Sequence, residues 1–194
     1  MNTAEIKQVM NKASRYLETR LENQLKKIET EKITQDRINK RSRSIRNLFF
    51  DKQIVFSKED TTAAHILYTL AAFANLLCQQ PKLINRLVLV QICSSKIPAH
   101  ELEAVPEIVR QINQLYGTTE FVPVHFYHQE IDQDELLAFM NAAHIGLCLN
   151  ASSAKEFALH TTHPLNTTIS VQDPSNIPQL TEALQNALVN HLMN

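Results

Sequence analysis

Glycine is scarce in this sequence, which holds only Gly117 and Gly146 among its 194 residues. Soluble proteins contain about 7% glycine, so the content is several-fold low. Loops that wrap a nucleotide phosphate need glycine, because the backbone must approach the anion without a Cβ in the way. Two distant glycines can form neither a G-x-G-x-x-G loop nor a Walker-type loop. The composition therefore argues against the common forms of nucleotide-phosphate binding.

Cysteines and long apolar runs are also few. Cys78, Cys93 and Cys148 lie far apart in apolar stretches and lack the spacing of a zinc site. They are therefore predicted to be reduced core thiols in a reducing compartment. No apolar run is long enough to cross a bilayer, and residues 1–12 lack the features of a secretory signal. We expect a cytoplasmic protein, or one that a pathogen delivers into a host cell.

The net charge of −1 hides an asymmetry along the chain. Residues 1–52 hold 13 Lys and Arg against 7 Asp and Glu, whereas residues 53–194 hold 6 against 13. A basic arm beside an acidic domain favours self-association or an anionic partner. We divide the chain into a long basic helix over residues 1–46 and a domain over residues 47–194.

Residues 3–40 contain neither proline nor glycine, which favours one long helix. Apolar residues recur there every three or four positions, which predicts an amphipathic helix with one narrow apolar stripe. Such a stripe must dock on its own domain, on a copy of itself or on another protein. The residues of the stripe are Ile6, Met10, Ala13, Leu17, Leu21, Leu25 and Ile28.

A cluster of cations follows this stripe and precedes Phe49 and Phe50. One interpretation is binding to an anionic membrane, a nucleic acid or an acidic protein. The other is a helix end whose cations complement the helix dipole. Nucleic acid is disfavoured because no aromatic residues that could stack on bases alternate with the cations. The candidate partner- or anion-binding residues are Arg37, Lys40, Arg41, Arg43 and Arg46.

From residue 52 onward, short apolar segments alternate with helical periodicity. Strands are expected at residues 53–56, 87–92, 120–125, 144–149 and 168–171. Helices are expected at residues 61–80, 101–116, 132–143 and 176–192, with a further helix starting near residue 153. Alternating strands and helices predict an α/β fold, a Rossmann-like parallel sheet of about five strands flanked by helices.

Several phrases in this half resemble trehalose-6-phosphate synthases in order and spacing. They include residues 89–92, 111–117, 121–125, 135–138 and 154–157, and the resemblance runs from about residue 52 to residue 192. That family consists of retaining glycosyltransferases of the GT-B type with two Rossmann-like domains. The resemblance implies that this chain matches the C-terminal domain, which holds the UDP-glucose donor. It implies no counterpart of the domain that holds glucose 6-phosphate, so half of a catalytic cleft would be missing.

The resemblance also locates the donor-binding positions. Counting without gaps implies Glu59 and Ala64 where the family has an arginine and a lysine on the donor diphosphate. Gln129 stands where a second family arginine follows a strand, and Lys96 is at best the equivalent of a third. A carboxylate repels a diphosphate and alanine offers no charge, so UDP-sugar binding should be weak or absent.

One donor ligand survives in the resemblance. Glu156 matches the glutamate that accepts hydrogen bonds from the donor ribose, and Lys155 precedes it at a helix start. The simpler interpretation is a solvated first helical turn, since a ribose contact without a diphosphate contact gives little affinity. The loop before it, residues 149–153, is shorter than in the family and lacks the family's aspartate and glycine.

Other chemistry has weak support in the sequence. His160, His163 and Cys148 do not form a closed zinc pattern, and no serine lies in a nucleophile elbow. We expect no catalytic residue, metal or cofactor. The predicted function is a non-catalytic, regulatory binding module whose partner is itself, a trehalose-pathway protein or a host protein. Two alternatives stay open: a nucleotide-sugar-binding half of a glycosyltransferase completed by another chain, and an adaptor for an anionic membrane or nucleic acid.

Overall fold

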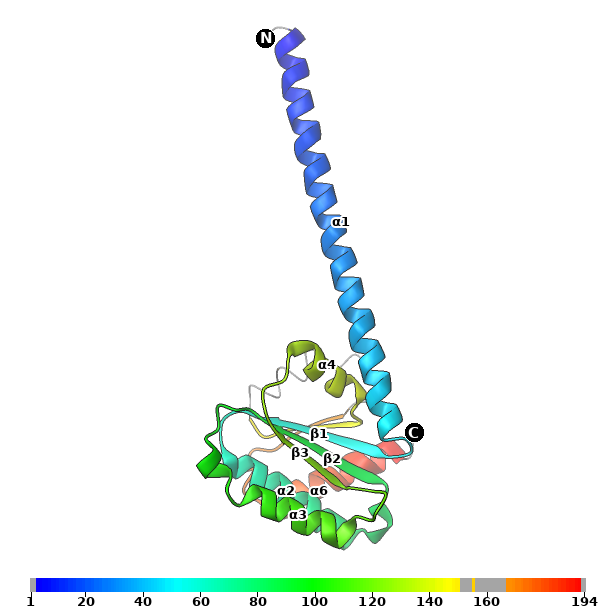
Figure 1. Cartoon of the computed structure of the whole chain (residues 1–194), viewed down its shortest axis with the longest axis vertical. Coiled ribbons are helices and arrows are strands. Elements are labelled where there is room, and N and C mark those ends of the chain that lie inside the picture. Colours follow the sequence, from blue (N-terminus) through cyan, green and yellow to red (C-terminus); the bar gives the residue numbers. More distant parts are fainter. Residues whose placement is uncertain (1–2, 151–154, 156–166, 193–194) are drawn as a thin grey trace. The chain divides into compact units, whose positions relative to one another are not determined.

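The protein is described by a computed structural model that covers residues 3–150, 155 and 167–192. The chain divides into two compact units, Met1–Lys40 and Arg41–Asn194. A single helix, α1 (Thr3–Leu48), forms the first unit and continues into the second. The second unit is an α/β domain. Figure 1 shows both, coloured along the sequence.

Helix α1 ends at Leu48, two residues after the end of the long basic helix predicted over residues 1–46. Its last turns belong to the α/β unit, where Ser42, Ile45 and the following Phe49 are buried. The compact α/β unit therefore begins at Arg41, six residues before the predicted boundary at Asn47. The reason is that Ile45, within the cationic segment, and Phe49, just after it, are buried in the core of the domain.

The α/β unit contains a five-stranded, fully parallel sheet, as the sequence predicts. Its three central strands, β1, β2 and β4, are largely buried and apolar, which is typical of parallel sheets covered on both faces. The order is β3-β2-β1-β4-β5, with Val55 of β1 between Leu89 of β2 and Ile145 of β4. The strands are β1 (Gln53–Glu59), β2 (Leu87–Cys93), β3 (Val124–His128), β4 (Ile145–Cys148) and β5 (Thr167–Ser170).

Helices cover the two faces of the sheet (Figure 1). One face carries α2 (Ala63–Gln79), α3 (Val105–Tyr116) and α6 (Ile177–Leu192), whose apolar side chains join alternate strand residues in one core. On the other face α4 (Gln133–Ala142) stacks Phe139 on Phe56 of β1, with ring centroids 5.6 Å apart. Short 3-10 helices, η1 (Pro81–Leu83) and η2 (Ala99–Leu102), precede β2 and α3.

The third strand begins four residues later than predicted. Residues 117–123 form a turn instead, in which the Thr118 N–H donates to the Phe121 carbonyl at 2.9 Å. The side chain of Asn113 then brackets Val124, accepting from its N–H at 2.9 Å and donating to its carbonyl at 3.0 Å. Gly117 permits this path, because a Cβ there would lie 2.4 Å from the Asn113 carbonyl oxygen.

In the described part of the chain, no helix has the length and apolar character needed to cross a membrane. Cys93 and Cys148 are buried free thiols, as predicted for core cysteines. The prediction of a core position is wrong for Cys78, which is exposed on α2. Its place in an apolar sequence stretch suggested a core position, but it lies on the solvent side of the helix.

Candidate functional site

The strand order creates a switch point at β1. The chain passes from β1 to β2 on one side, whereas β4 lies on its other side, so the connections leave in opposite directions. In open parallel sheets ligands bind at the carboxyl ends of the strands at such a point. Glu59 ends β1 and Asn150 follows β4, so these side chains mark the candidate site.

Glu59 is a buried carboxylate, only 2% exposed, and it is extensively hydrogen-bonded. One oxygen, Oε1, accepts from the Asp60 N–H at 3.0 Å, from the Thr61 N–H at 2.7 Å and from the Thr61 hydroxyl. The other, Oε2, lies 2.8 Å from Nδ1 of His65. The Asn150 amide donates to both oxygens at 3.3 and 3.4 Å. The carboxylate thus joins the end of β1, the start of α2 and the loop after β4.

The hydrogen bonds keep Glu59 ionised despite its burial. Burial is the largest single influence and raises the pKa of Glu59, but the bonds from Thr61 and His65 together outweigh it. The net result is a pKa below the usual carboxyl value. The switch point therefore carries a fixed negative charge at neutral pH.

The start of α2 is satisfied by the chain itself. The Thr62 side chain is the N-cap and accepts from the Ala64 N–H at 3.2 Å. Glu59 accepts the N–H groups of the two residues before this cap. The Ala64 N–H of the first helical turn and the N–H groups of Asp60 and Thr61 before it are therefore already used by side-chain oxygens and are not available to an anion.

A second carboxylate, Glu130, lies at the ends of β2 and β3. Its Oε1 accepts from the Ser94 hydroxyl at 2.5 Å, the Ser95 N–H at 3.0 Å and the Ser95 hydroxyl at 2.9 Å. The bond from Ser94 is the largest cause that lowers the pKa of Glu130. Burial, followed by the charges of Glu59 and Glu130, raises the pKa of Cys93 to about 11. This thiol stays protonated and is unsuited to nucleophilic chemistry.

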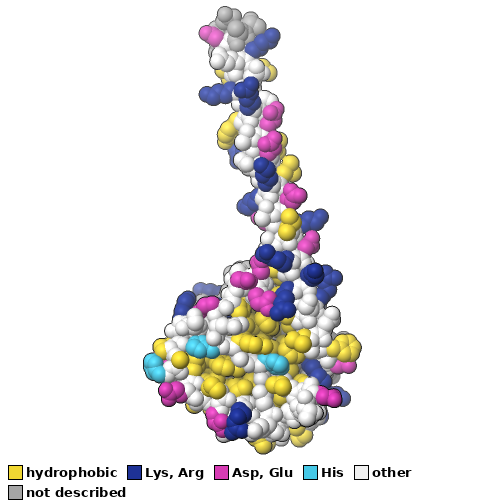
Figure 2. All heavy atoms as spheres, viewed as in Figure 1, with side chains coloured by type: hydrophobic (Ala, Val, Ile, Leu, Met, Phe, Trp, Pro, Cys, Tyr) yellow, Lys and Arg dark blue, Asp and Glu magenta, His cyan; other side chains and the backbone are white. Residues whose placement is uncertain are grey.

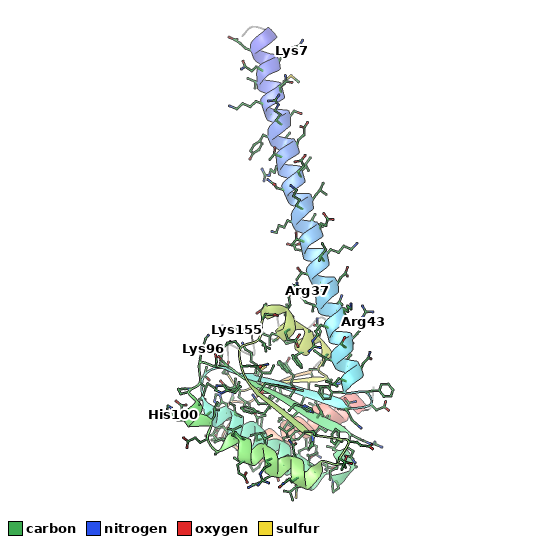
Figure 3. All side chains as sticks on the ribbon, in the orientation of Figure 1. Lys7, Arg37, Arg43, Lys96, His100 and Lys155 are labelled. Atoms are coloured by element: carbon green, nitrogen blue, oxygen red, sulfur yellow. The ribbon has the colours of Figure 1, made fainter. Side chains whose placement is uncertain are left out.

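The structure places the predicted donor positions as follows. Glu59 is the last residue of β1 and Ala64 is the second residue of α2, and Lys96 and Gln129 are exposed after β2 and β3. Lys155 is helical and exposed, whereas Glu156 lies outside the described residues. Figure 3 labels Lys96 and Lys155 at the same end of the α/β unit. His65, Asn150 and Glu130 are site residues that the sequence interpretation did not identify.

The cationic segment is divided between the two units. Arg41 forms a two-pronged ion pair with Glu135, with three N–O distances from 2.7 to 3.0 Å. Arg46 donates to the carbonyl of Asn141. Both of these cations are thus engaged inside the α/β unit. The other predicted cations, Arg37, Lys40 and Arg43, are exposed side chains.

A surface hollow of about 550 Å³ lies elsewhere, near the amino ends of β1 and β2. Lys52, Lys82 and Arg86 contribute to its lining, with Asp51 and Asn85 in the left-handed backbone region. Ligands of open parallel sheets bind at the opposite, carboxyl edge. The switch point is therefore the better candidate. No cluster of three metal-binding side chains occurs among the described residues, and the histidines of residues 160–163 lie outside them.

The family of the chain is decided by its sequence. The profile of glycosyltransferase family 20 matches residues 24–153, about two thirds of the chain. The chain belongs to glycosyltransferase family 20. This confirms the resemblance predicted from the sequence, but the matching region begins inside α1 and not at residue 52, and it ends at residue 153 and not at residue 192.

Individual relatives support this membership. A UDP-forming alpha,alpha-trehalose-phosphate synthase of Candida albicans is 29% identical over 127 residues, which cover 62% of this chain and 26% of that protein. A trehalose-phosphatase of Schizosaccharomyces pombe is 33% identical over 100 residues, which cover 49% of this chain and 12% of that protein. The chain thus spans at most about a quarter of these curated relatives.

Solved structures share the fold. The UDP-forming trehalose-phosphate synthase of Burkholderia xenovorans superposes with a TM-score of 0.69 at 18% identity, covering 78% of this chain and 42% of that one. The N-terminal domain of the Candida albicans trehalose-6-phosphate phosphatase superposes with a TM-score of 0.71 at 19% identity, covering 82% of this chain and 40% of that one. The chain is therefore a relative of trehalose-phosphate synthases with a glycosyltransferase fold.

Proposed function

We propose that this chain is a non-catalytic member of glycosyltransferase family 20 that acts as a binding or regulatory module. The observation that carries the proposal is the buried, ionised carboxylate of Glu59 at the switch point. It occupies the position where the resemblance to trehalose-6-phosphate synthases implies an arginine on the donor diphosphate. The charge at that position has therefore changed sign.

The negative charge of Glu59 acts against the diphosphate of a nucleotide sugar. Two like charges near the surface of a protein repel by about 4 kcal/mol at 4 Å when the effective dielectric constant is 20. Glu59 also takes the N–H groups of Asp60 and Thr61, which removes backbone donors from the switch point. Ala64 and Gln129 add no compensating cation. A donor phosphate would meet a negative charge and few donors.

The names of the relatives are compatible with a glycosyltransferase-like domain that does not itself form a glycosidic bond. One solved relative is the N-terminal domain of a protein named as a trehalose-6-phosphate phosphatase. A glycosyltransferase fold therefore occurs in a chain whose name denotes a different activity. We propose that the partner is a protein: a copy of this chain, a protein of the trehalose pathway or a host protein.

Isothermal titration of the whole chain with UDP and with UDP-glucose tests the proposal. We expect no saturable heat up to about 1 mM ligand, which corresponds to less than about 4 kcal/mol of binding free energy. The double variant Glu59→Gln with Ala64→Lys removes the negative charge and supplies a cation, so it should bind UDP more tightly than the natural chain. Micromolar binding of UDP-glucose by the natural chain would overturn the proposal.

The alternative is a nucleotide-sugar-binding half of a glycosyltransferase that another chain completes. The exposed Lys96 and Lys155 at the carboxyl end of the sheet favour it, since cations there attract phosphate. The same titration separates the two proposals. The alternative predicts saturable UDP-glucose binding that weakens in Lys96→Ala, Lys155→Ala and Glu156→Ala. The matched control is Lys82→Ala, an exposed lysine near the amino ends of the strands.

A further inference from the structure

Helix α1 exposes a row of large apolar side chains in the Met1–Lys40 unit. Met10, Leu17, Leu21, Leu25 and Ile28 are each between 57% and 66% exposed. The described part of this unit is one helix, so the unit has no second element of its own to cover them. Contiguous exposed apolar surface of this kind marks an interaction site. Figure 2 shows apolar side chains among charged ones along the helix.

The row stays on one side of the helix. With Ala13, the five steps from Met10 to Ile28 cover 18 residues, which equals the 3.6 residues of an α-helical turn. The stripe therefore runs parallel to the helix axis for about 27 Å. Val9, Tyr16 and Ile33 are equally exposed but lie off this line. A straight stripe fits another straight helix along its whole length.

We propose that a second copy of this chain covers the stripe, with the two helices parallel and in register. Two charged residues near the middle of the stripe support this choice. Glu18 and Arg20 are two positions apart, so they flank the stripe on opposite sides. In a parallel pair opposite flanks meet, which brings Glu18 of each copy beside Arg20 of the other. Glu31 and Lys32, adjacent residues just beyond the stripe, also lie toward opposite flanks of it.

An antiparallel pair would reverse this complementarity. Overlap of the Met10–Ile28 parts of the two stripes centres the pair on Thr19, midway between these two residues. Like flanks then meet, so Glu18 lies near Glu18 of the other copy and Arg20 near the other Arg20. Like charges at a helix interface destabilise the pair and select against that partner orientation. The charges therefore distinguish the two orientations, and they favour the parallel one.

This inference goes beyond the proposed function, because it concerns α1 and not the switch point at the end of β1. The titration with UDP and the measurement of mass are independent. A dimer that binds UDP would overturn only the proposed function. A monomer that does not bind UDP would overturn only the present inference.

Light scattering on the whole chain at about 100 μM tests the association. We expect twice the monomer mass, and a dissociation constant raised about tenfold or more in Ile28→Asn. The matched control is Ile33→Asn, because Ile33 is 63% exposed against 61% for Ile28 but lies off the stripe. Circular dichroism establishes that both variants stay helical. A monomer at this concentration, or equal effects of the two variants, would overturn the proposal.

Cysteine cross-linking tests the orientation. In a background with the exposed Cys78 replaced by serine, Ala13→Cys should form a disulfide-linked dimer with itself on mild oxidation. In an antiparallel pair Ala13 faces Leu25, so cross-linking would require a mixture with Leu25→Cys. Charge reversal gives a second measurement: Glu18→Arg should weaken the dimer, and adding Arg20→Glu should restore it. Cross-linking only in the mixture, or no response to charge reversal, would contradict the parallel pair.

Discussion

The two units of the chain treat apolar side chains in opposite ways. In the α/β unit Leu70, Phe73 and Leu89 are completely buried between the sheet and its helices. In the Met1–Lys40 unit side chains of the same kind, such as Leu21, are mostly exposed along one helix. The α/β unit has a core of its own. The Met1–Lys40 unit has exposed apolar surface and no core among its described residues, and an isolated helix gains little stability from its own backbone.

A matched pair of leucine substitutions tests this contrast most strongly. Leu70→Ala removes a fully buried side chain, so we expect the free energy of unfolding of the α/β unit to fall by about 2–5 kcal/mol. Leu21→Ala, at a side chain that is 59% exposed, should change it by less than about 0.5 kcal/mol. Urea unfolding followed by tyrosine fluorescence measures this, since three of the four tyrosines lie in the α/β unit. Similar losses of unfolding free energy in the two variants would contradict the contrast between the buried and the exposed leucine.

Gly117 tests whether the α/β unit also depends on close backbone packing. An added Cβ would lie 2.4 Å from the Asn113 carbonyl oxygen and 2.9 Å from that of Phe121. Because both neighbours are backbone atoms, Gly117→Ala should lower the free energy of unfolding by about 1–3 kcal/mol. Thr119→Ala, at an exposed position of the same turn, is the control. Thermal unfolding measures both, and an unchanged midpoint for Gly117→Ala would refute the steric explanation.

Glu59 tests whether the charge at the switch point stabilises the fold. Glu59→Gln keeps the shape but removes charge-assisted hydrogen bonds, so we expect a loss of about 1–2 kcal/mol near neutral pH. The pKa of Glu59 is lowered by folding, so its stabilisation is present above the ordinary value of 4.5 and lost as pH falls through the folded value. The free energy of unfolding, measured in urea between about pH 7 and pH 3, should therefore decrease less steeply with falling pH for the variant than for the natural chain. Parallel pH profiles would contradict this.

The smallest expected effect concerns Arg41 and Glu135, which join the end of α1 to α4 within the α/β unit. Their side chains are 51% and 26% exposed, so solvent screens the pair. A double-mutant cycle with alanine should give a coupling energy of about 0.2–1 kcal/mol. The coupling should shrink in about 1 M salt, where the Debye length is near 3 Å. A coupling that is insensitive to salt would mean that packing, and not charge, links the two residues.

Much of the fold could be predicted from the sequence, because its local signals are strong. The run Leu87–Cys93 is apolar with β-branched residues, and the helix predicted over residues 61–80 is α2 (Ala63–Gln79). The third strand was misplaced because residues 120–123 resemble a strand locally. Pro123 has no N–H for a ladder, and the Gly117 turn depends on contacts with α3.

The candidate site could be predicted only in part. Glu59 and Ala64 followed from ungapped spacing to a family motif. His65, Asn150 and Glu130 did not, because their hydrogen bonds to Glu59 or Ser94 depend on how the ends of the strands meet in the fold. Asn150 is 91 residues from Glu59, and no local pattern joins them.

The sequence by itself determined the alternation of strands and helices, the length of most elements, the apolar stripe of α1 and the family. These follow from periodicity and spacing, which are properties of neighbouring residues. Only the tertiary structure decided that Glu59 is buried, ionised and bonded to the start of α2, and that α1 continues into the α/β core. Both depend on segments far apart in the chain, which meet only when the parallel sheet assembles.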